Sequence, residues 1–390
     1  MREWPGRYYM QNPVLWHVPH RSTTIKPLKM NSRAIRKIVV IGLGAAARGI
    51  HLPAYAGLPG AQVVAACDPI ASDGKRAFPV YDSLEHLLSD HRPDIGVVAS
   101  PTASHFPIAR QLIERGIHVL CEKPFTDRLN EAVELVRLAT AHDVRLAVNN
   151  EFRFMACHQA AQKLIGDPRF GELRFVNMVQ TFHATAESEV GWRGSDPERT
   201  CKEFGTHVFD LCRFFFGTEP IRLRAHMPRP GGPGTTRSPD LLNLIDLEFP
   251  DDRWARITLN RVTAGRHRYL DIQLDGTAGS IETSLGGHVE VALGLNAPTR
   301  RPYVRADISP GSRAYLYHGE GRQKLAADSL NIFADATRRL MQGFLESLDT
   351  GALPPCHGSD NLRTFALMRA AYDSAATDRD VDLSFLEALP

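Results

Sequence analysis

The sequence lacks the features that mark a membrane protein or a nucleic-acid-binding protein. It contains no apolar run of roughly 18 or more residues, the length that a membrane-spanning helix requires. Its 46 Lys and Arg residues are balanced by 44 Asp and Glu, and they form no basic stripe of the kind that follows a phosphate backbone. We therefore expect neither a membrane nor nucleic acid as a partner.

Cysteine is also scarce. The six cysteines form no CxxC pair, and most lie in apolar or helical-looking runs, where a free thiol behaves as a small hydrophobic side chain. The first residues lack the apolar core of a secretory signal. These observations predict a cytoplasmic protein. The Cys and His spacings do not match a zinc site, so we expect no bound metal.

Three segments are indicated by the pattern along the 390 residues. Residues 1–35, rich in Pro, Arg and aromatics without a period, suggest an N-terminal arm or a disordered leader. In residues 36–150, short β-branched runs alternate with amphipathic segments, which predicts a doubly wound parallel sheet and an α/β class. Residues 151–390 pass from helices to successive strands. They predict an α+β domain with a mostly antiparallel, open-faced sheet, whose last helix can pack back on the first domain.

The first motif is "VVIGLGAAARG", in which Gly42 and Gly44 follow a strand and open a helix. Glycines let the backbone turn tightly and approach a pyrophosphate, whose charge meets the amide end of the helix. Ala46 lies in the same turn, and Ala47 stands at the third glycine position, an accepted variant. The pattern predicts a dinucleotide-binding (Rossmann) domain.

Asp68 ends the next strand, "VVAACD", about 20 residues after the glycines. A carboxylate at this place accepts hydrogen bonds from the adenosine ribose and repels the 2′-phosphate of NADP, so NAD is the expected cofactor. Lys75 and Arg76 leave NADP as an alternative. The other interpretation of Asp68 is a residue that caps a turn.

Two further strands end in "SPTASH" and "LCEKPFTD". Ligands of open α/β sheets bind at the carboxyl ends of the strands, which makes Ser100, Thr102, His105 and Glu122 candidates for cofactor contact. A serine-proline turn followed by a helix cap fits the first motif equally well. For Lys123, in the second motif, the alternative to an active-site role is a surface lysine at a turn.

In their order and spacing, "GLGAAARG", "ACD", "SPTASH" and above all "CEKP" resemble the glucose-fructose oxidoreductase / inositol dehydrogenase (Gfo/Idh/MocA) family, from about Arg36 to the C-terminus. The resemblance implies an NAD(P)-dependent dehydrogenase or reductase acting on a sugar, a cyclitol or a nucleotide-linked sugar. It also implies that Lys123 projects into the active site, with an unusual peptide geometry before Pro124. A partly desolvated lysine beside a cationic nicotinamide loses its proton more readily, which suits proton transfer.

The segment "ERTCKEFGTHVFD" resembles a second site motif of the family, with departures. His207 and Asp210 match, Glu203 replaces an aspartate, and Glu198 and Arg199 stand where family members have glycines. On one helix, Glu203, His207 and Asp210 share a face, where a carboxylate favours a protonated imidazole and fixes its tautomer. By resemblance, His207 is the acid or base at the reacting carbon and Glu203 helps to bind the substrate hydroxyl. The alternative is a first-turn glutamate beside a core histidine.

The remaining candidates for the substrate side are Arg153, Trp192, Arg193 and Asp210, because an aromatic ring and a guanidinium suit a polyol, a sugar or an acidic group. Two other functions stay open. The fold also serves as a cofactor-bound regulator without turnover, and some enzymes use NAD for net non-redox sugar chemistry. An antiparallel sheet with helices on one face only predicts a homodimer or a homotetramer.

Overall fold

The computed structural model describes residues 35–70, 77–184, 196–228, 239–265, 267–295, 300 and 302–390. Residues 1–34, Lys75, Arg76, Trp192, Arg193 and most of the Gly/Pro-rich stretch 228–240 lie outside these residues, so the predictions made for them stay predictions. Among the described residues, no helix combines the length and the apolar character needed to cross a bilayer.

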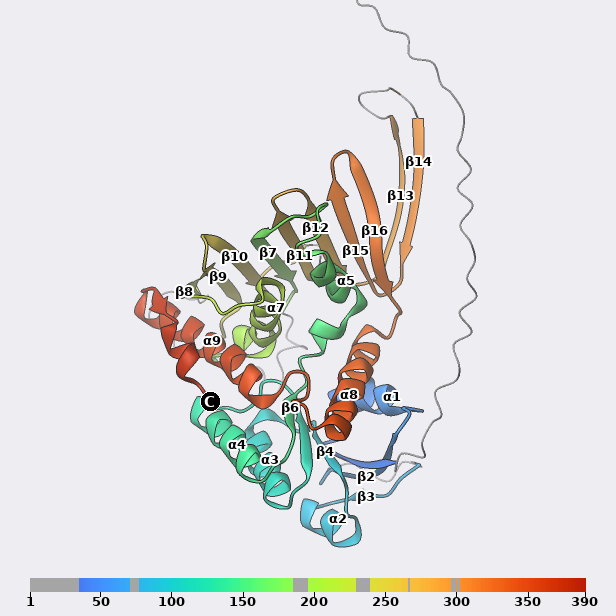
Figure 1. The fold of residues 1–390 in the computed structure, drawn as a ribbon, viewed down its shortest axis with the longest axis vertical. Helices are drawn as coiled ribbons and strands as arrows, with labels where there is room; N and C mark the ends of the chain where they lie inside the picture. Colours follow the sequence, from blue (N-terminus) through green and yellow to red (C-terminus); the bar gives the residue numbers. More distant parts are fainter. Residues whose placement is uncertain are drawn as a thin grey trace, which may run out of the picture. The chain divides into compact units, whose positions relative to one another are not determined.

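Six parallel strands form the first sheet, in the order β3-β2-β1-β4-β5-β6 (Figure 1). This is the doubly wound order, in which the reversal between β1 and β4 opens a crevice at the carboxyl ends of the strands. The predicted parallel sheet is confirmed, although the two-residue β3 is too short to show a pattern. The strands are β1 Arg36–Ile41, β2 Ala61–Cys67, β3 Val80–Tyr81, β4 Ile95–Val98, β5 His118–Cys121 and β6 Leu146–Val148.

Both faces of this sheet are covered, which explains its continuous apolar strands. In β1, Val39 and Ile41 belong to one core cluster, and Ile38 and Val40 to another on the opposite face. The covering helices are the π-helical segment η1 Ala47–His51, α1 Leu52–Tyr55, α2 Leu84–Asp90, α3 His105–Glu114 and α4 Leu129–Ala141. Two helices from the end of the chain, α8 Ile332–Thr350 and α9 Gly358–Thr377, contact α1 and α4, respectively (Figure 1).

The second sheet has nine strands in the order β16-β15-β12-β11-β7-β10-β9-β8-β17. Only β7 and β10 pair in parallel, so the predicted mostly antiparallel sheet is confirmed. Its strands are β7 Leu173–Thr181, β8 Arg222–His226, β9 Leu242–Phe249, β10 Arg253–Asn260, β11 Arg268–Gly276, β12 Ser280–Leu285, β15 Ser312–His318, β16 Gly321–Asp328 and β17 Val381–Asp382. The strands β13 His288–Leu295 and β14 Pro302–Ser309 form a separate two-stranded sheet.

Alternating burial along these strands places one face of the large sheet on the core. In β9, Ile245, Leu247 and Phe249 are buried, while the residues between them are partly open. The helices α5 Ala156–Leu164 and α7 Thr206–Phe216 contact strands of this sheet. A π-helical segment, η4 Cys201–Gly205, precedes α7, and Gly217 ends α7 in the left-handed conformation at φ 66°. The segment η4 carries Glu203 and α7 carries His207, so this junction positions the predicted site.

Candidate active site

A cavity of about 960 Å³ lies at the carboxyl ends of the parallel strands. Its walls come from both sheets: the ends of β1, β2, β4, β5 and β6 on one side, and η4, α7, β11 and the start of α8 on the other. Most of the predicted site residues line it, namely Gly42, Gly44, Ala46, Asp68, Ser100, Thr102, His105, Glu122, Lys123, Glu203 and His207.

The two glycines of the first turn have different surroundings. Gly42 has φ +91°, and a Cβ on it would lie 2.6 Å from the backbone nitrogen of Ser100, so only glycine fits between β1 and the end of β4. A Cβ on Gly44 would meet nothing within 4 Å. The backbone at Gly44 therefore faces open space where a pyrophosphate can approach. The helix that follows is short, with five π-helical and four α-helical residues.

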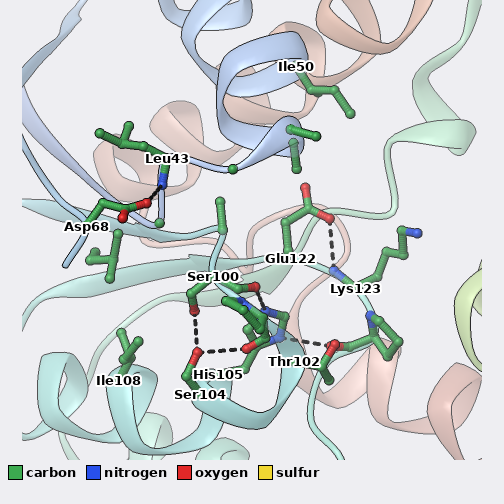
Figure 2. A pocket seen from close by; sticks show the side chains of 18 of the residues that line it. Leu43, Ile50, Asp68, Ser100, Thr102, Ser104, His105, Ile108, Glu122 and Lys123 are labelled. Carbon is green, nitrogen blue, oxygen red and sulfur yellow. Dashed lines mark hydrogen bonds between the residues drawn. The ribbon is translucent and has the colours of Figure 1, made fainter. Parts of the chain in front are cut away.

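Asp68 holds this turn and also lines the cavity (Figure 2). Its carboxylate accepts hydrogen bonds from the backbone N–H of Leu43 at 2.7 Å and of Ile70 at 2.8 Å. Each carboxylate oxygen has more than one acceptor position, so these bonds leave capacity for a ribose hydroxyl. The turn-capping interpretation and the cofactor interpretation of Asp68 are thus compatible.

His105 joins the two loops at the ends of β4 and β5. Its ring is 1% exposed, with Nε2 at 2.9 Å from the carbonyl oxygen of Ser100 and Nδ1 at 3.0 Å from that of Pro124 (Figure 2). Both ring nitrogens are thus engaged by the protein. His105 also lines the cavity, so its predicted contact with the cofactor stays a prediction.

Glu122 forms a buried network beneath the cavity. Its carboxylate lies 2.7 Å from Nε2 of His51 and accepts hydrogen bonds from Nδ2 of Asn149 at 2.8 Å and from the backbone N–H of Lys123 at 3.1 Å. Burial acts to raise the pKa of Glu122, but the hydrogen bond and charge of His51 and the charge of Lys123 hold it below its ordinary value. Glu122 is therefore an anion that fixes the loop carrying Lys123.

Lys123 joins the loop after β5 to the π-helical segment η4. Its peptide bond to Pro124 is cis, so the unusual geometry implied by the family resemblance is present. The side chain leaves the β5 loop in a direction different from that of Glu122 (Figure 2). Its Nζ donates a hydrogen bond to the backbone carbonyl of Glu203, in η4, at 3.1 Å.

His207 lies in an aromatic environment. It is 3% exposed, and its ring stacks on Phe152 with 3.9 Å between centroids and 10° between planes. Burial, and then the charge of Lys123, lower the pKa of His207 well below its ordinary value. The imidazole is therefore neutral at pH 7, contrary to the protonated ring expected beside two carboxylates. Its Nδ1 is buried without a hydrogen-bond partner among the described residues.

Of the three residues expected on one face, Glu203 and His207 line the cavity, whereas Asp210, on the same helix as His207, does not. The segment Cys201–Gly205 is π-helical, which changes the residue spacing ahead of α7. Glu203 lines the cavity and forms an ion pair with the almost fully buried Arg199. This ion pair gives the buried Arg199 a carboxylate partner.

Asp210 and Arg153 do not lie on the substrate side of the cavity, where they were expected. The Asp210 carboxylate binds Nε of Arg153 at 2.6 Å and Nδ2 of Asn150 at 3.1 Å. Arg153 also pairs with Asp360 at 2.9 Å. Neither Arg153 nor Asp210 is among the described residues that line the cavity. Because buried charges are stable only when paired, Arg153 is committed to Asp210 and Asp360, and Asp210 is committed to Arg153.

The sequence patterns missed several residues of the substrate side. Glu151 begins the 3₁₀ turn η3, Glu151–Phe154, directly after the loop that follows β6. The strand-end rule that selected Ser100 and Glu122 selects Glu151 as well when it is applied to β6. The other missed lining residues come from η4 and its approach, β11 and α8, namely Asp196, Arg199, Lys202, Tyr269 and Phe333.

The glycine turn, the strand-end lysine and the neutral histidine line one cavity, as expected for a dinucleotide-dependent enzyme. Comparison with known families agrees. Residues 36–150 match the model of the oxidoreductase family with an NAD-binding Rossmann fold (Gfo/Idh/MocA), and residues 158–282 match the Gfo/Idh/MocA C-terminal domain. The chain belongs to the Gfo/Idh/MocA family of NAD(P)-dependent oxidoreductases, and its first domain binds NAD.

Among named relatives, D-apiose dehydrogenase of Rhizobium rhizogenes is 26% identical over 353 residues, which cover 85% of this chain and 93% of that protein. The 1,5-anhydro-D-fructose reductase of Ensifer adhaerens is 24% identical over 77% of this chain and 83% of its own length. An oxidoreductase from Agrobacterium radiobacter, solved with NAD+, L-tartaric acid and magnesium, superposes with a TM-score of 0.73 at 21% identity, covering 90% of this chain and 99% of that one. This last likeness shows the fold.

Proposed function

We propose that this protein transfers a hydride between NAD and a secondary alcohol or ketone of a sugar, a cyclitol or a nucleotide-linked sugar, with Lys123 and His207 handling the hydroxyl proton. The observation that carries the proposal is that Lys123 and an electrically neutral His207 line the same cavity as the glycine turn and Asp68. The sugar class is supported by the names of the relatives, which act on D-apiose and on 1,5-anhydro-D-fructose.

The cofactor fits the residues that are present. Gly44 leaves room for the pyrophosphate, Asp68 keeps acceptor capacity for the ribose, and Ser100 and Thr102 line the path towards Lys123. When bound, the nicotinamide supplies the hydride acceptor or donor. Lys75 and Arg76 lie outside the described residues, so the preference for NAD over NADP is proposed from Asp68 alone.

The proton must leave the alcohol as the hydride leaves, because an isolated alkoxide in a cavity of low polarity is costly. A neutral imidazole accepts a proton, and the lowered pKa of His207 keeps it in that form at pH 7. Lys123, held at the backbone carbonyl of Glu203, places a second proton carrier at the same cavity. Glu203 is a candidate for binding the substrate hydroxyl, with Arg199 fixing its carboxylate.

The assembly is part of the same proposal. The large sheet buries one face against helices, and we expect the other face to pair with a second copy of the chain in a homodimer or a homotetramer. Light scattering of the purified protein measures this directly, and a monomer at micromolar concentration would contradict it.

The activity is tested by titrating the protein with NADH and with NADPH by fluorescence, and then screening D-apiose, 1,5-anhydro-D-fructose, myo-inositol and other sugars for a change in nicotinamide absorbance. We expect NADH to bind and at least one sugar to turn over. Lys123→Ala should abolish turnover without preventing NADH binding, while Lys163→Ala, on the exposed side of α5, should change neither.

The outcomes separate the alternatives. Binding of NADH without turnover of any compound would favour a cofactor-bound regulator. If NAD stays tightly bound and does not exchange with free NAD during turnover, the result would favour an enzyme that uses NAD for net non-redox sugar chemistry. Absence of binding to either nucleotide would refute the proposal.

A further inference from the structure

Glu151 occupies the substrate end of the cavity but has no part in the function proposed so far. It begins η3 and lines the cavity, and its side chain is 97% buried, with 3% exposure. The next residue, Phe152, is the ring that stacks on His207. The backbone therefore places the Glu151 carboxyl group in the same cavity as the two proposed proton carriers.

The carboxyl oxygen Oε2 of Glu151 is buried and has no hydrogen-bond partner among the described residues. Buried polar atoms almost always have a partner, since leaving one unsatisfied is unfavourable. A cavity-lining atom without a protein partner is satisfied when a ligand supplies the missing group. His207 Nδ1, in the same cavity wall, is in the same situation.

Burial and the charges around Glu151 determine whether its carboxyl group is protonated when it contacts a ligand. Burial, and then the negative charge of Glu122, raise the pKa of Glu151 to about 8, against the opposing charge of Lys123. The other titratable groups that face it are Asp210, Tyr269 and Cys356. At pH 7 the group is mainly an uncharged carboxylic acid, which both donates and accepts a hydrogen bond.

A hydroxyl group is the natural complement, because it too both donates and accepts. An anionic ligand group would place a negative charge beside Glu122, and an apolar group would leave Oε2 unsatisfied. We propose that Glu151 is a specificity-determining residue that binds a second hydroxyl of a polyol substrate, next to the hydroxyl handled by Lys123 and His207. This inference rests on the proposed function and extends it, since it requires at least two hydroxyls close together in the substrate.

Two substitutions of Glu151 test this role by kinetics in the full-length protein. Glu151→Met removes the hydrogen-bonding group at similar size, so KM for the sugar that turns over should rise about tenfold or more with a smaller change in kcat. Glu151→Gln keeps a neutral group that donates and accepts, so KM at pH 7 should rise no more than a few fold. Glu346→Gln, at an exposed position of α8, is the matched control.

The pH dependence distinguishes a hydrogen-bonding role from a packing role. The pKa of Glu151 is raised, so the carboxyl group is protonated below about pH 8 and becomes charged as the pH rises through that value. KM of the wild-type protein should therefore increase above about pH 8, whereas KM of Glu151→Gln should not show this increase. Equal pH profiles in the two proteins would overturn the proposal.

An infrared measurement needs no turnover. The wild-type protein with NAD+ bound should show the carbonyl stretch of a protonated carboxylic acid at pH 7, and Glu151→Gln should lack this band. D-apiose, myo-inositol or glycerol should shift the band when it occupies the cavity. A wild-type protein without the band, or a band that none of the three compounds shifts, would show that Glu151 does not bind a polyol.

The failure of this inference is distinguishable from failure of the proposed function. If NADH binds, a sugar turns over and Lys123→Ala is inactive, but both Glu151 variants keep the wild-type KM, then only the role of Glu151 is refuted. If NADH does not bind at all, the proposed function fails first. Thermal unfolding of each variant shows whether a loss of activity comes from a loss of fold.

Discussion

The two sides of the cavity are built differently. The cofactor side is made from residues at the ends of parallel strands, and its carboxylates are paired: Asp68 with two N–H groups and Glu122 with three partners. The substrate side is made from side chains on η3, η4, α7 and β11. Two buried side-chain atoms of this wall, Oε2 of Glu151 and Nδ1 of His207, have no hydrogen-bond partner among the described residues.

This difference indicates how binding is divided. A dinucleotide has the same pyrophosphate and ribose in every enzyme, so a preformed backbone turn suffices to hold it. A sugar is recognised by hydroxyl positions, and recognition of a hydroxyl needs side-chain groups that remain unsatisfied until it arrives. Glu151 Oε2 and His207 Nδ1 have that property, and both line the cavity.

The largest expected effect is on the substrate side. His207→Gln keeps the approximate size but removes a group that can accept and pass on a proton, so kcat should fall by about 10² to 10⁴. NADH binding should be unchanged, because His207 belongs to the other wall. His86→Gln, exposed on α2, serves as the control. A kcat within threefold of wild type would remove His207 from the chemistry.

The second effect distinguishes a stabilising role of Asp210 in the core from a role in substrate binding. Asp210→Ala breaks the buried pair with Arg153, and we expect the free energy of unfolding to fall by about 3 kcal/mol, with KM nearly unchanged. Urea unfolding measures this. In the control Asp246→Ala, the pair with Arg256 is partly exposed, so the loss should be below about 1 kcal/mol. A raised KM with wild-type stability would return Asp210 to the substrate site.

The third effect compares two glycines of the cofactor side. Gly42→Ala places a Cβ against Ser100 at a positive φ, which should lower the free energy of unfolding by about 1 to 3 kcal/mol. Gly44→Ala meets no protein atom, so stability should change by less than about 0.5 kcal/mol. Its methyl group should nevertheless weaken NADH binding about tenfold. Thermal unfolding measures the change in stability, and fluorescence titration measures the affinity for NADH. Normal NADH affinity in Gly44→Ala would place the pyrophosphate elsewhere.

The smallest effect concerns the choice of cofactor. Asp68→Ala removes the acceptor for the ribose hydroxyls and the charge that repels a 2′-phosphate, so the preference for NADH over NADPH should shrink about tenfold. Asp82→Ala, exposed at the rim of the same cavity, controls for a general change in charge. An unchanged preference would mean that Asp68 acts only on the turn through Leu43 and Ile70.

Local pattern was enough to predict the parallel sheet, the glycine turn and the residues at its strand ends, because each of these depends on a few consecutive residues. It was not enough to show that Asp210 lies away from the cavity that Glu203 and His207 line. The partner of Asp210 is Arg153, which is distant in the sequence, so local spacing could not indicate the pair.

The sequence by itself determined the family, the cofactor-binding domain and the position of Lys123, since short motifs and strand periodicity encode them. The tertiary structure alone decided that Arg153 and Asp210 are partners in the core, that His207 is neutral and that Glu151 faces the cavity. Burial, charge state and pairing depend in part on residues that are distant in the chain: the ring stacked on His207 is Phe152 and the charge that lowers its pKa is that of Lys123, and no local pattern around position 207 contains either.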